Sequence, residues 1–183
     1  MLCLGMAVPA FAADLPLLVD EAGLLSAAEY DSVNAALEKV SARLDFDVVV
    51  ITIDGVGDLE IEDAAAQIFE GYHYGRGAES SGALLLIDMR ARNWAIVGFG
   101  FGETAVNDDA IDYIADAIVP KLSDGDFAAA FTTYAELCEK LVSNAMQGKV
   151  YKPPFRFFNA LAISLLISFV VAFGRAMKTS VLS

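Results

Sequence analysis

Residues 47–54 read Asp-Val-Val-Val-Ile-Thr-Ile-Asp, and this run decides the fold of the chain. Its β-branched side chains are almost continuous instead of alternating with polar ones, as in a strand that is buried on both faces. A second run of the same kind, Gly82 to Asp88, follows later in the chain. We therefore expect two central strands in one sheet.

A first helix is expected just before residues 47–54. Ser26 and Glu29 form an S-x-x-E capping box, in which each residue satisfies a free backbone N–H group of the other. Apolar residues then recur on one helical face, at Val33, Leu37, Val40 and Leu44. The chain thus enters its first central strand from an amphipathic helix.

A second helix is expected between the two strands, on a face marked by Ile61, Ala65, Ile68 and Tyr72. A strand, a helix and a strand in this order imply a right-handed crossover and parallel pairing. Asn93 to Gly98 follows the second strand after a short turn and should return antiparallel to it.

Two further helices are expected, from Asp108 to Ile118, stopped by Pro120, and from about Asp126 to Asn144. Together these elements predict an α/β fold, a three-layer α/β/α sandwich on a small mixed sheet, followed by one transmembrane helix.

Apolar segments flank this domain of residues 14–146. Residues 1–12 end in Ala10-Phe11-Ala12, the small-residue pattern of a cleavage site, and are expected to be a signal peptide truncated at its start. Residues 157–174 carry no ionisable side chain. As a helix they would span roughly 27 Å, close to the bilayer's hydrocarbon thickness of about 30 Å. We expect a transmembrane helix there, after a linker (147–156) and before a short basic tail (175–183).

The expected location is therefore the cell membrane, with a single pass and the main domain outside the cytosol. The formal net charge is −13, and all 25 acidic residues lie between Asp14 and Glu139. Such an acidic body repels phosphate backbones, so we expect no nucleic-acid partner. The lipid bilayer, met through residues 157–174, and a membrane protein complex are the expected partners.

Four segments resemble the TPM domain family over about Leu18 to Val142. They are residues 19–26, residues 69–77, residues 82–87 and residues 96–103, which read VDEAGLLS, FEGYHYGRG, GALLLI and IVGFGFGE. The resemblance implies a secreted or membrane-tethered protein, because members of this family usually are. It also implies one of three activities known in the family: binding of divalent cations, weak acid phosphatase activity, or service as an accessory subunit of a membrane complex. Ser80-Ser81-Gly82 departs from the family's usual acidic-Asn-Gly turn.

Motifs for catalysis are absent from the sequence. It has no H-E-x-x-H, no G-x-S-x-G, no P-loop and no paired cysteines, and a lone His73 cannot build a zinc site of the usual kind. Gly98-x-Gly-x-Gly102 follows a strand that closes a hairpin, so a tight loop or a close backbone approach is expected in place of dinucleotide binding.

Acidic residues provide the remaining signal. Glu103, Asp108, Asp109 and Asp112 lie in or after a glycine-rich loop, where oxygen ligands suit calcium or magnesium. The alternative explanation is a solvated helical face, stabilised by water, salt and the helix N-terminus.

A second acidic group, Asp54 with Asp88 and nearby Asp20, is expected at the carboxyl ends of the parallel strands. Ligands gather there in open α/β sheets, although such aspartates also form simple turns.

Three functions are compatible with these features. The first is a membrane-anchored, extracytoplasmic module that binds divalent cations and supports a membrane complex. The second is a divalent-metal-dependent acid phosphatase, for which Arg76, Arg90 and Arg92 are the basic candidates and no nucleophile can be identified. The third is a passive structural tether.

Overall fold

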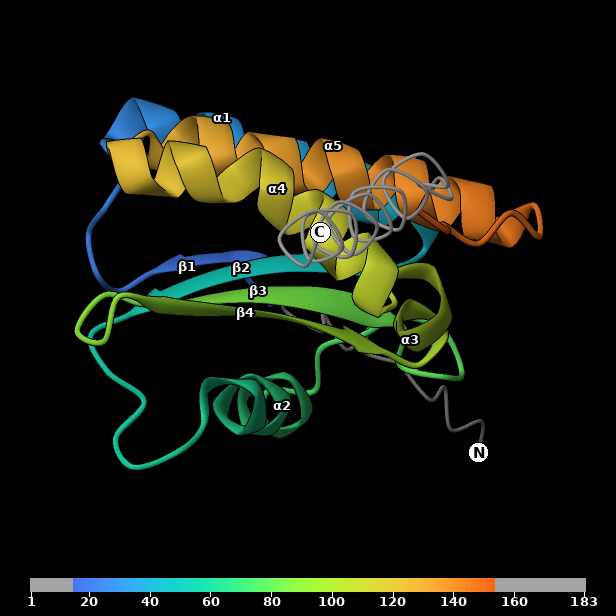
Figure 1. Cartoon of the computed structure of the whole chain (residues 1–183), viewed down its shortest axis with the longest axis horizontal. Coiled ribbons are helices and arrows are strands. Elements are labelled where there is room, and N and C mark those ends of the chain that lie inside the picture. Colours follow the sequence, from blue (N-terminus) through green and yellow to red (C-terminus); the bar gives the residue numbers. More distant parts are fainter. Residues whose placement is uncertain (1–14, 154–183) are drawn as a thin grey trace, which may run out of the picture. The chain divides into compact units, whose positions relative to one another are not determined.

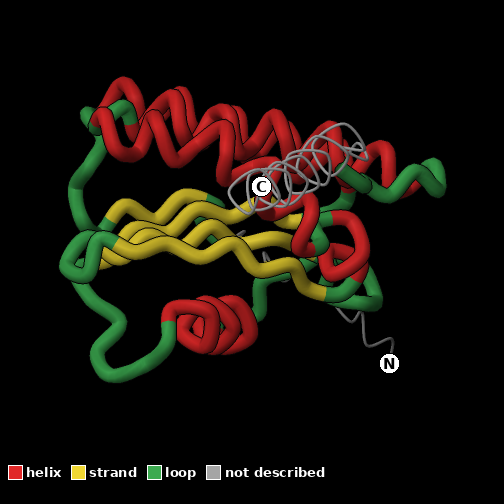
Figure 2. The backbone as a smooth tube through the Cα atoms, viewed as in Figure 1, coloured by secondary structure: helices red, strands yellow, loops and turns green. Residues whose placement is uncertain are grey.

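The computed structural model describes residues 15–153 of the chain. Figure 1 shows a sheet between two layers of helices, with α1, α4 and α5 on one face and α2 on the other. Figure 2 shows the same arrangement by secondary structure. The elements are β1 (Leu18–Asp20), α1 (Ala27–Leu44), β2 (Asp47–Ile53), α2 (Ile61–Gly71), β3 (Gly82–Asp88), β4 (Asn93–Phe99), α3 (Phe101–Ala105), α4 (Asp108–Asp124) and α5 (Phe127–Met146).

The sheet has the order β1-β2-β3-β4. β2 pairs in parallel with both β1 and β3, and β4 pairs antiparallel with β3. The parallel pairing of the two central strands and the antiparallel return are therefore confirmed. All residues of β3 are buried, and in β2 only Ile53 is partly exposed, because helices cover both faces of the sheet.

The capping box at the start of α1 is also confirmed. The Ser26 hydroxyl accepts a hydrogen bond from the Glu29 N–H, and the Glu29 carboxylate accepts one from the Ser26 N–H at 2.8 Å. The Ser26 hydroxyl also donates to the Glu29 carboxylate at 2.6 Å, and this bond, together with the one from the Ser26 N–H, lowers the pKa of Glu29, since both favour its charged form. The apolar stripe of α1 is buried as expected, at Val33, Leu37, Val40 and Leu44.

The expected fold class needs correction in its last element, the transmembrane helix. Within residues 15–153 no helix is both long and apolar enough to cross a bilayer, so this part of the chain is an α/β/α domain alone. The segment expected to span, residues 157–174, lies outside the described residues. The expected signal peptide and basic tail lie outside them as well.

Three local features differ from the expected pattern. β1 and α3 were not expected, and α4 was expected to stop at Pro120 but continues to Asp124. Pro120 cannot donate a backbone hydrogen bond to the carbonyl of Asp116, yet both residues are exposed, so water can serve that carbonyl. Gly125 caps the end of the helix in the left-handed conformation, with φ of 79°, which glycine adopts without strain.

Candidate functional site

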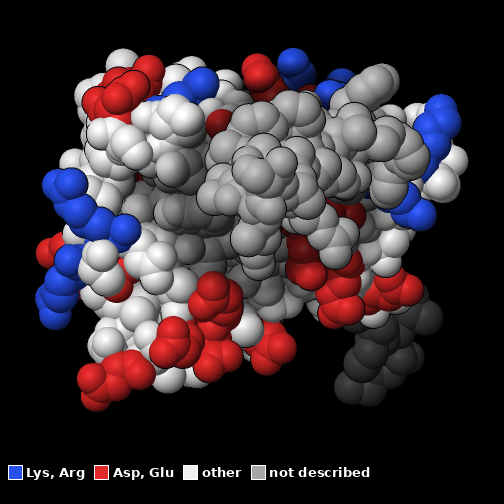
Figure 3. Space-filling view, viewed as in Figure 1, with Lys and Arg blue, Asp and Glu red and all other residues white. Residues whose placement is uncertain are grey.

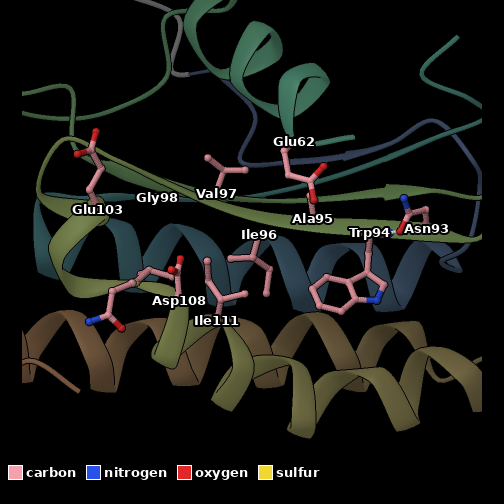
Figure 4. Close-up of a pocket in the computed structure, with 12 residues that line it drawn as sticks. Glu62, Asn93, Trp94, Ala95, Ile96, Val97, Gly98, Glu103, Asp108 and Ile111 are labelled. Atoms are coloured by element: carbon pink, nitrogen blue, oxygen red, sulfur yellow. Dashed lines mark hydrogen bonds between the residues drawn. The ribbon is translucent and has the colours of Figure 1, made fainter. Parts of the chain in front are cut away.

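An open pocket of about 700 Å³ follows β4 along most of its length. Figure 4 shows β4 between two walls, with Glu62 of α2 on one side and Asp108 and Ile111 of α4 on the other. We call this pocket the β4 groove. Its lining residues are Glu62, Asn93, Trp94, Ala95, Ile96, Val97, Gly98, Glu103, Val106, Asn107, Asp108 and Ile111.

Aromatic packing holds the α2 wall in place. The ring of Phe69 on α2 stacks on the ring of Phe99 at the end of β4, with centroids 3.8 Å apart and planes 6° from parallel. Phe69 is buried, so this contact fixes α2 against one face of β4. Glu62 stands exposed in the first turn of the same helix.

Close backbone contacts hold α3 at the other end of the groove. A β-carbon on Gly102 would collide with the carbonyl oxygen of Gly82, and Gly100 has φ of 56°. The close approach and positive φ expected of the glycine motif are therefore confirmed. As a result, α3 turns back tightly after β4 and places the exposed Glu103 beside the groove.

The N-terminus of α4 completes this wall. Asn107 caps the helix, its side-chain oxygen accepting a hydrogen bond from the Ala110 N–H at 3.0 Å. Asp108 lies in the first turn, where the positive end of the helix dipole stabilises a carboxylate, and it lines the groove. Asp109 does not line it, and Asp112 is exposed further along α4.

The groove is acidic. Among residues 15–153, Glu62, Glu103 and Asp108 are the only charged residues that line it, and none of these lining residues is Lys, Arg or His. In the view of Figure 3, acidic residues gather on the part of the surface where Figure 1 shows α2 and α3, and basic residues lie at the margins. A concave surface with charges of one sign concentrates ions of the opposite sign.

The structure therefore brings two of the expected cation ligands, Glu103 and Asp108, to one pocket. Their carboxylates point in different directions in Figure 4. Among residues 15–153, no three His, Cys, Asp or Glu side chains lie close enough together to hold a metal ion.

The second expected group, Asp20, Asp54 and Asp88, does lie at one end of the sheet. Asp20 is opposite Thr52 in the parallel register, and Asp88 is opposite Ile53. The Asp20 carboxylate accepts hydrogen bonds from the N–H groups of Leu24 and Leu25, at 3.1 and 2.9 Å. It thus holds the turn before α1.

Asp88 is a turn former too. Its carboxylate accepts hydrogen bonds from the backbone N–H groups of Val56, Arg90 and Ala91, at 2.8 to 3.1 Å. Burial acts to raise the pKa of Asp88, but these hydrogen bonds and the Arg90 guanidinium outweigh burial and lower that pKa below its usual value. Asp54 is exposed beside this turn.

The two acidic groups lie at opposite ends of the sheet. Gly82, the first residue of β3, pairs with Phe99 beside α3, whereas Asp88 is the last residue of β3. A strand of this length extends about 20 Å. Asp20 and Glu103 therefore do not share a site.

Glu62 and Trp94 are groove residues that sequence reasoning missed. The sequence could not indicate Glu62 as a groove residue, because its position beside β4 depends on which face of the sheet α2 covers. Trp94 could have been found from the sequence, since it is the only tryptophan and lies on a strand expected to close a hairpin. Arg76, Arg90 and Arg92 do not line the groove.

Comparison with known proteins agrees with the fold. A family model described as "TPM domain" matches residues 18–141. The UPF0603 protein YdjH of Bacillus subtilis (strain 168) is 32% identical over 121 residues, which are 66% of this chain and 46% of that protein. The chain thus matches about half the length of this curated relative.

Three solved structures share the fold. The N-terminal domain of a P. gingivalis protein has a TM-score of 0.62 at 22% identity, covering 77% of this chain and 90% of the other. BA42 from Bizionia argentinensis has a TM-score of 0.58 at 18% identity, and the match covers 70% of this chain and 86% of BA42. The N-terminal domain of cg2496 from Corynebacterium glutamicum has a TM-score of 0.57 at 18% identity, and the match covers 80% of this chain and 91% of that domain.

Proposed function

The chain belongs to the TPM domain family, and we propose that it is an interaction domain, an accessory module of a larger complex, that binds positively charged groups in the β4 groove. One observation carries this proposal: Glu62, Glu103 and Asp108 line a single groove, and no described residue that lines it is basic. The location outside the cytosol, indicated by residues 1–12, stays a prediction.

The chemistry of the groove favours binding over phosphate-ester hydrolysis. A phosphate monoester is an anion, so three carboxylates with no arginine or lysine among the described lining residues repel it unless a bound metal ion offsets their charge. Arg76, the basic candidate beside the sheet, already pairs with Asp47, with 2.7 Å between Nε and Oδ1. Among the described residues, the groove thus offers no arginine that could bind the phosphate of an acid phosphatase substrate.

A divalent cation is the second part of the proposal. Magnesium usually keeps several of its waters and binds proteins through one or two carboxylates, which is what Glu103 and Asp108 offer. Both residues are exposed, so the expected affinity is low. Calcium, which takes six to eight oxygen ligands, fits this groove less well than magnesium.

A thermal melt of the full chain tests cation binding. A ligand that binds only the native state at a hundredfold excess over Kd adds about 2.7 kcal/mol, so magnesium should raise the melting temperature. The variant Glu103→Gln/Asp108→Asn should lose this rise. Asp31→Asn/Glu136→Gln, which neutralises two exposed carboxylates outside the groove, should keep it.

Equal melting temperatures in magnesium, in calcium and in chelator at matched ionic strength would contradict cation binding. They would leave the interaction role untouched, because that role rests on the groove's charge alone.

Site-specific photo-crosslinking in cells of the source organism tests the interaction role. A photoreactive residue in place of Asn93, which is exposed and lines the groove, should trap a protein. The same residue in place of Asp31, exposed on α1, should not. The crosslink from position 93 should disappear in the triple variant Glu62→Gln/Glu103→Gln/Asp108→Asn. Equal crosslinking from both positions, or none from Asn93, would refute the interaction role.

A further inference from the structure

The outer edge of β4 is open in the described part of the chain. β4 pairs with β3 on one side, and no described strand pairs with its other side. Alternate N–H and C=O groups of an edge strand point outward without a partner, and another extended chain can pair with them.

β4 lacks the charged residues, prolines and bulges by which natural proteins protect such edges. Its sequence, from Asn93 to Phe99, contains no Lys, Arg, Asp, Glu or Pro, and its register with β3 runs without a bulge. The opposite edge of the sheet differs, since β1 has only three residues, Leu18–Asp20. Of the two edges, β4 is the one long enough to accept a strand.

The β4 groove lies along this same edge. It follows the strand from Asn93 to Gly98, and Figure 4 shows α2 and α4 flanking it. A strand added to a sheet lies about 4.8 Å from its neighbour, and its side chains alternate between the two faces. One face of an added strand would meet Glu62, and the other would meet Asp108 and Ile111.

We propose that an extended, basic segment of a partner protein binds by adding a strand to the outer edge of β4. The main-chain hydrogen bonds hold the segment, and its Lys or Arg side chains pair with Glu62, Glu103 and Asp108. The occupant follows from charge complementarity, because every charged residue that lines the groove in the described part of the chain is acidic. The inference rests on the proposed interaction role and requires no divalent cation.

A peptide titration of the full chain tests this inference. The probe is a seven-residue peptide of alternating lysine and valine, and two controls replace lysine by glutamate or carry an N-methyl group on every residue, so that neither edge of the peptide can donate a backbone hydrogen bond. Trp94, the only tryptophan, lines the groove, so its fluorescence reports binding there. The lysine peptide should change that fluorescence, and both controls should leave it unchanged.

Hydrogen exchange measured residue by residue separates strand pairing from simple charge attraction. With the groove about 90% occupied, outward amides of β4 should exchange about tenfold more slowly. The Glu62→Gln/Asp108→Asn variant should bind the lysine peptide about tenfold more weakly, because two partly screened ion pairs are lost. The Asp31→Asn/Glu136→Gln variant should bind it like the unmodified chain.

Equal binding of the N-methylated peptide would overturn strand addition, because that peptide cannot form the ladder. Slow exchange of the outward β4 amides without peptide would overturn it too. Slow exchange that depends on protein concentration would identify a second copy as the occupant, and concentration-independent protection would identify another segment of this chain. If Asn93 still traps a partner in cells, the interaction role stands even when strand addition fails.

Discussion

A β-carbon built on Gly98 would lie 2.5 Å from the carbonyl oxygen of Gly102. Gly98 is on β4 and Gly102 is on α3, so the missing side chain allows the helix to approach the strand it follows. This contact places Glu103, the next residue of α3, beside the groove.

The variant Gly98→Ala should push α3 away from β4. We expect a loss of about 1–3 kcal/mol in the free energy of unfolding, because backbone atoms must move to admit the methyl group. Urea unfolding measures this loss. Gly71→Ala is the matched control, since a β-carbon there has no atom within 4 Å and a helix favours alanine. Equal stabilities of the two variants would contradict the close contact.

The variant Asp88→Asn should reduce stability at neutral pH by about 1–2 kcal/mol, because the turn loses a charged acceptor. The lowered pKa of Asp88 sets the pH dependence. Its contribution is present above the pKa of the unfolded chain, about 3.9, and is lost as pH falls through the lower folded pKa. The difference between the two proteins in urea unfolding should therefore shrink at strongly acidic pH.

Asp54→Asn is the control for this experiment, since Asp54 is exposed at the same end of the sheet. It should change stability little at any pH. A difference for Asp88→Asn that stays constant from neutral to strongly acidic pH would show that its charge is not involved.

Cys138 should resist thiol reagents in the folded protein. Burial raises the pKa of its thiol to about 12. At pH 8 only about one part in 10,000 is then the reactive thiolate. Labelling at this residue, followed by mass spectrometry, should require unfolding and should accelerate strongly in denaturant. Fast labelling of the native protein at Cys138 would contradict its burial.

The variant Arg76→Ala should loosen the loop between α2 and β3. The Asp47 carboxylate accepts hydrogen bonds from the Arg76 Nε–H at 2.7 Å and from the Gly75 N–H at 2.8 Å. We expect a loss of about 1–2 kcal/mol for this half-buried pair, and faster cleavage after Glu79 by a glutamate-specific protease. Lys39→Ala, an exposed change on α1, should affect neither measurement.

The central strands could be predicted because burial on both faces leaves a continuous apolar run. Residues 47–54 and 82–88 carry that run, and the helical pattern between them required parallel pairing. β1 and α3 are too short, at three and five residues, for any periodicity to emerge. Pro120 was misjudged because proline removes one helical hydrogen bond, and an exposed helix face can bear that loss.

The candidate site was predictable only where one segment supplies it. Glu103 and Asp108 stand out in the acidic run that follows β4, and both line the groove. Glu62 joins them from α2 because of the crossover, which no local pattern reveals. Asp20 and Asp88 were expected as ligands because we placed them near the carboxyl ends of the parallel strands. In the structure their carboxylates accept hydrogen bonds from nearby backbone N–H groups, so both residues hold turns.

The unequal edges of the sheet limit how far copies of this domain can assemble. Two copies that joined through β4 would form a two-fold pair and leave only the short β1 edges, Leu18–Asp20, at its ends. Three residues offer far fewer hydrogen bonds to another strand than the seven of β4 do. Among the described residues, such a pair would therefore expose only short edges, and further growth through the sheet would be weak.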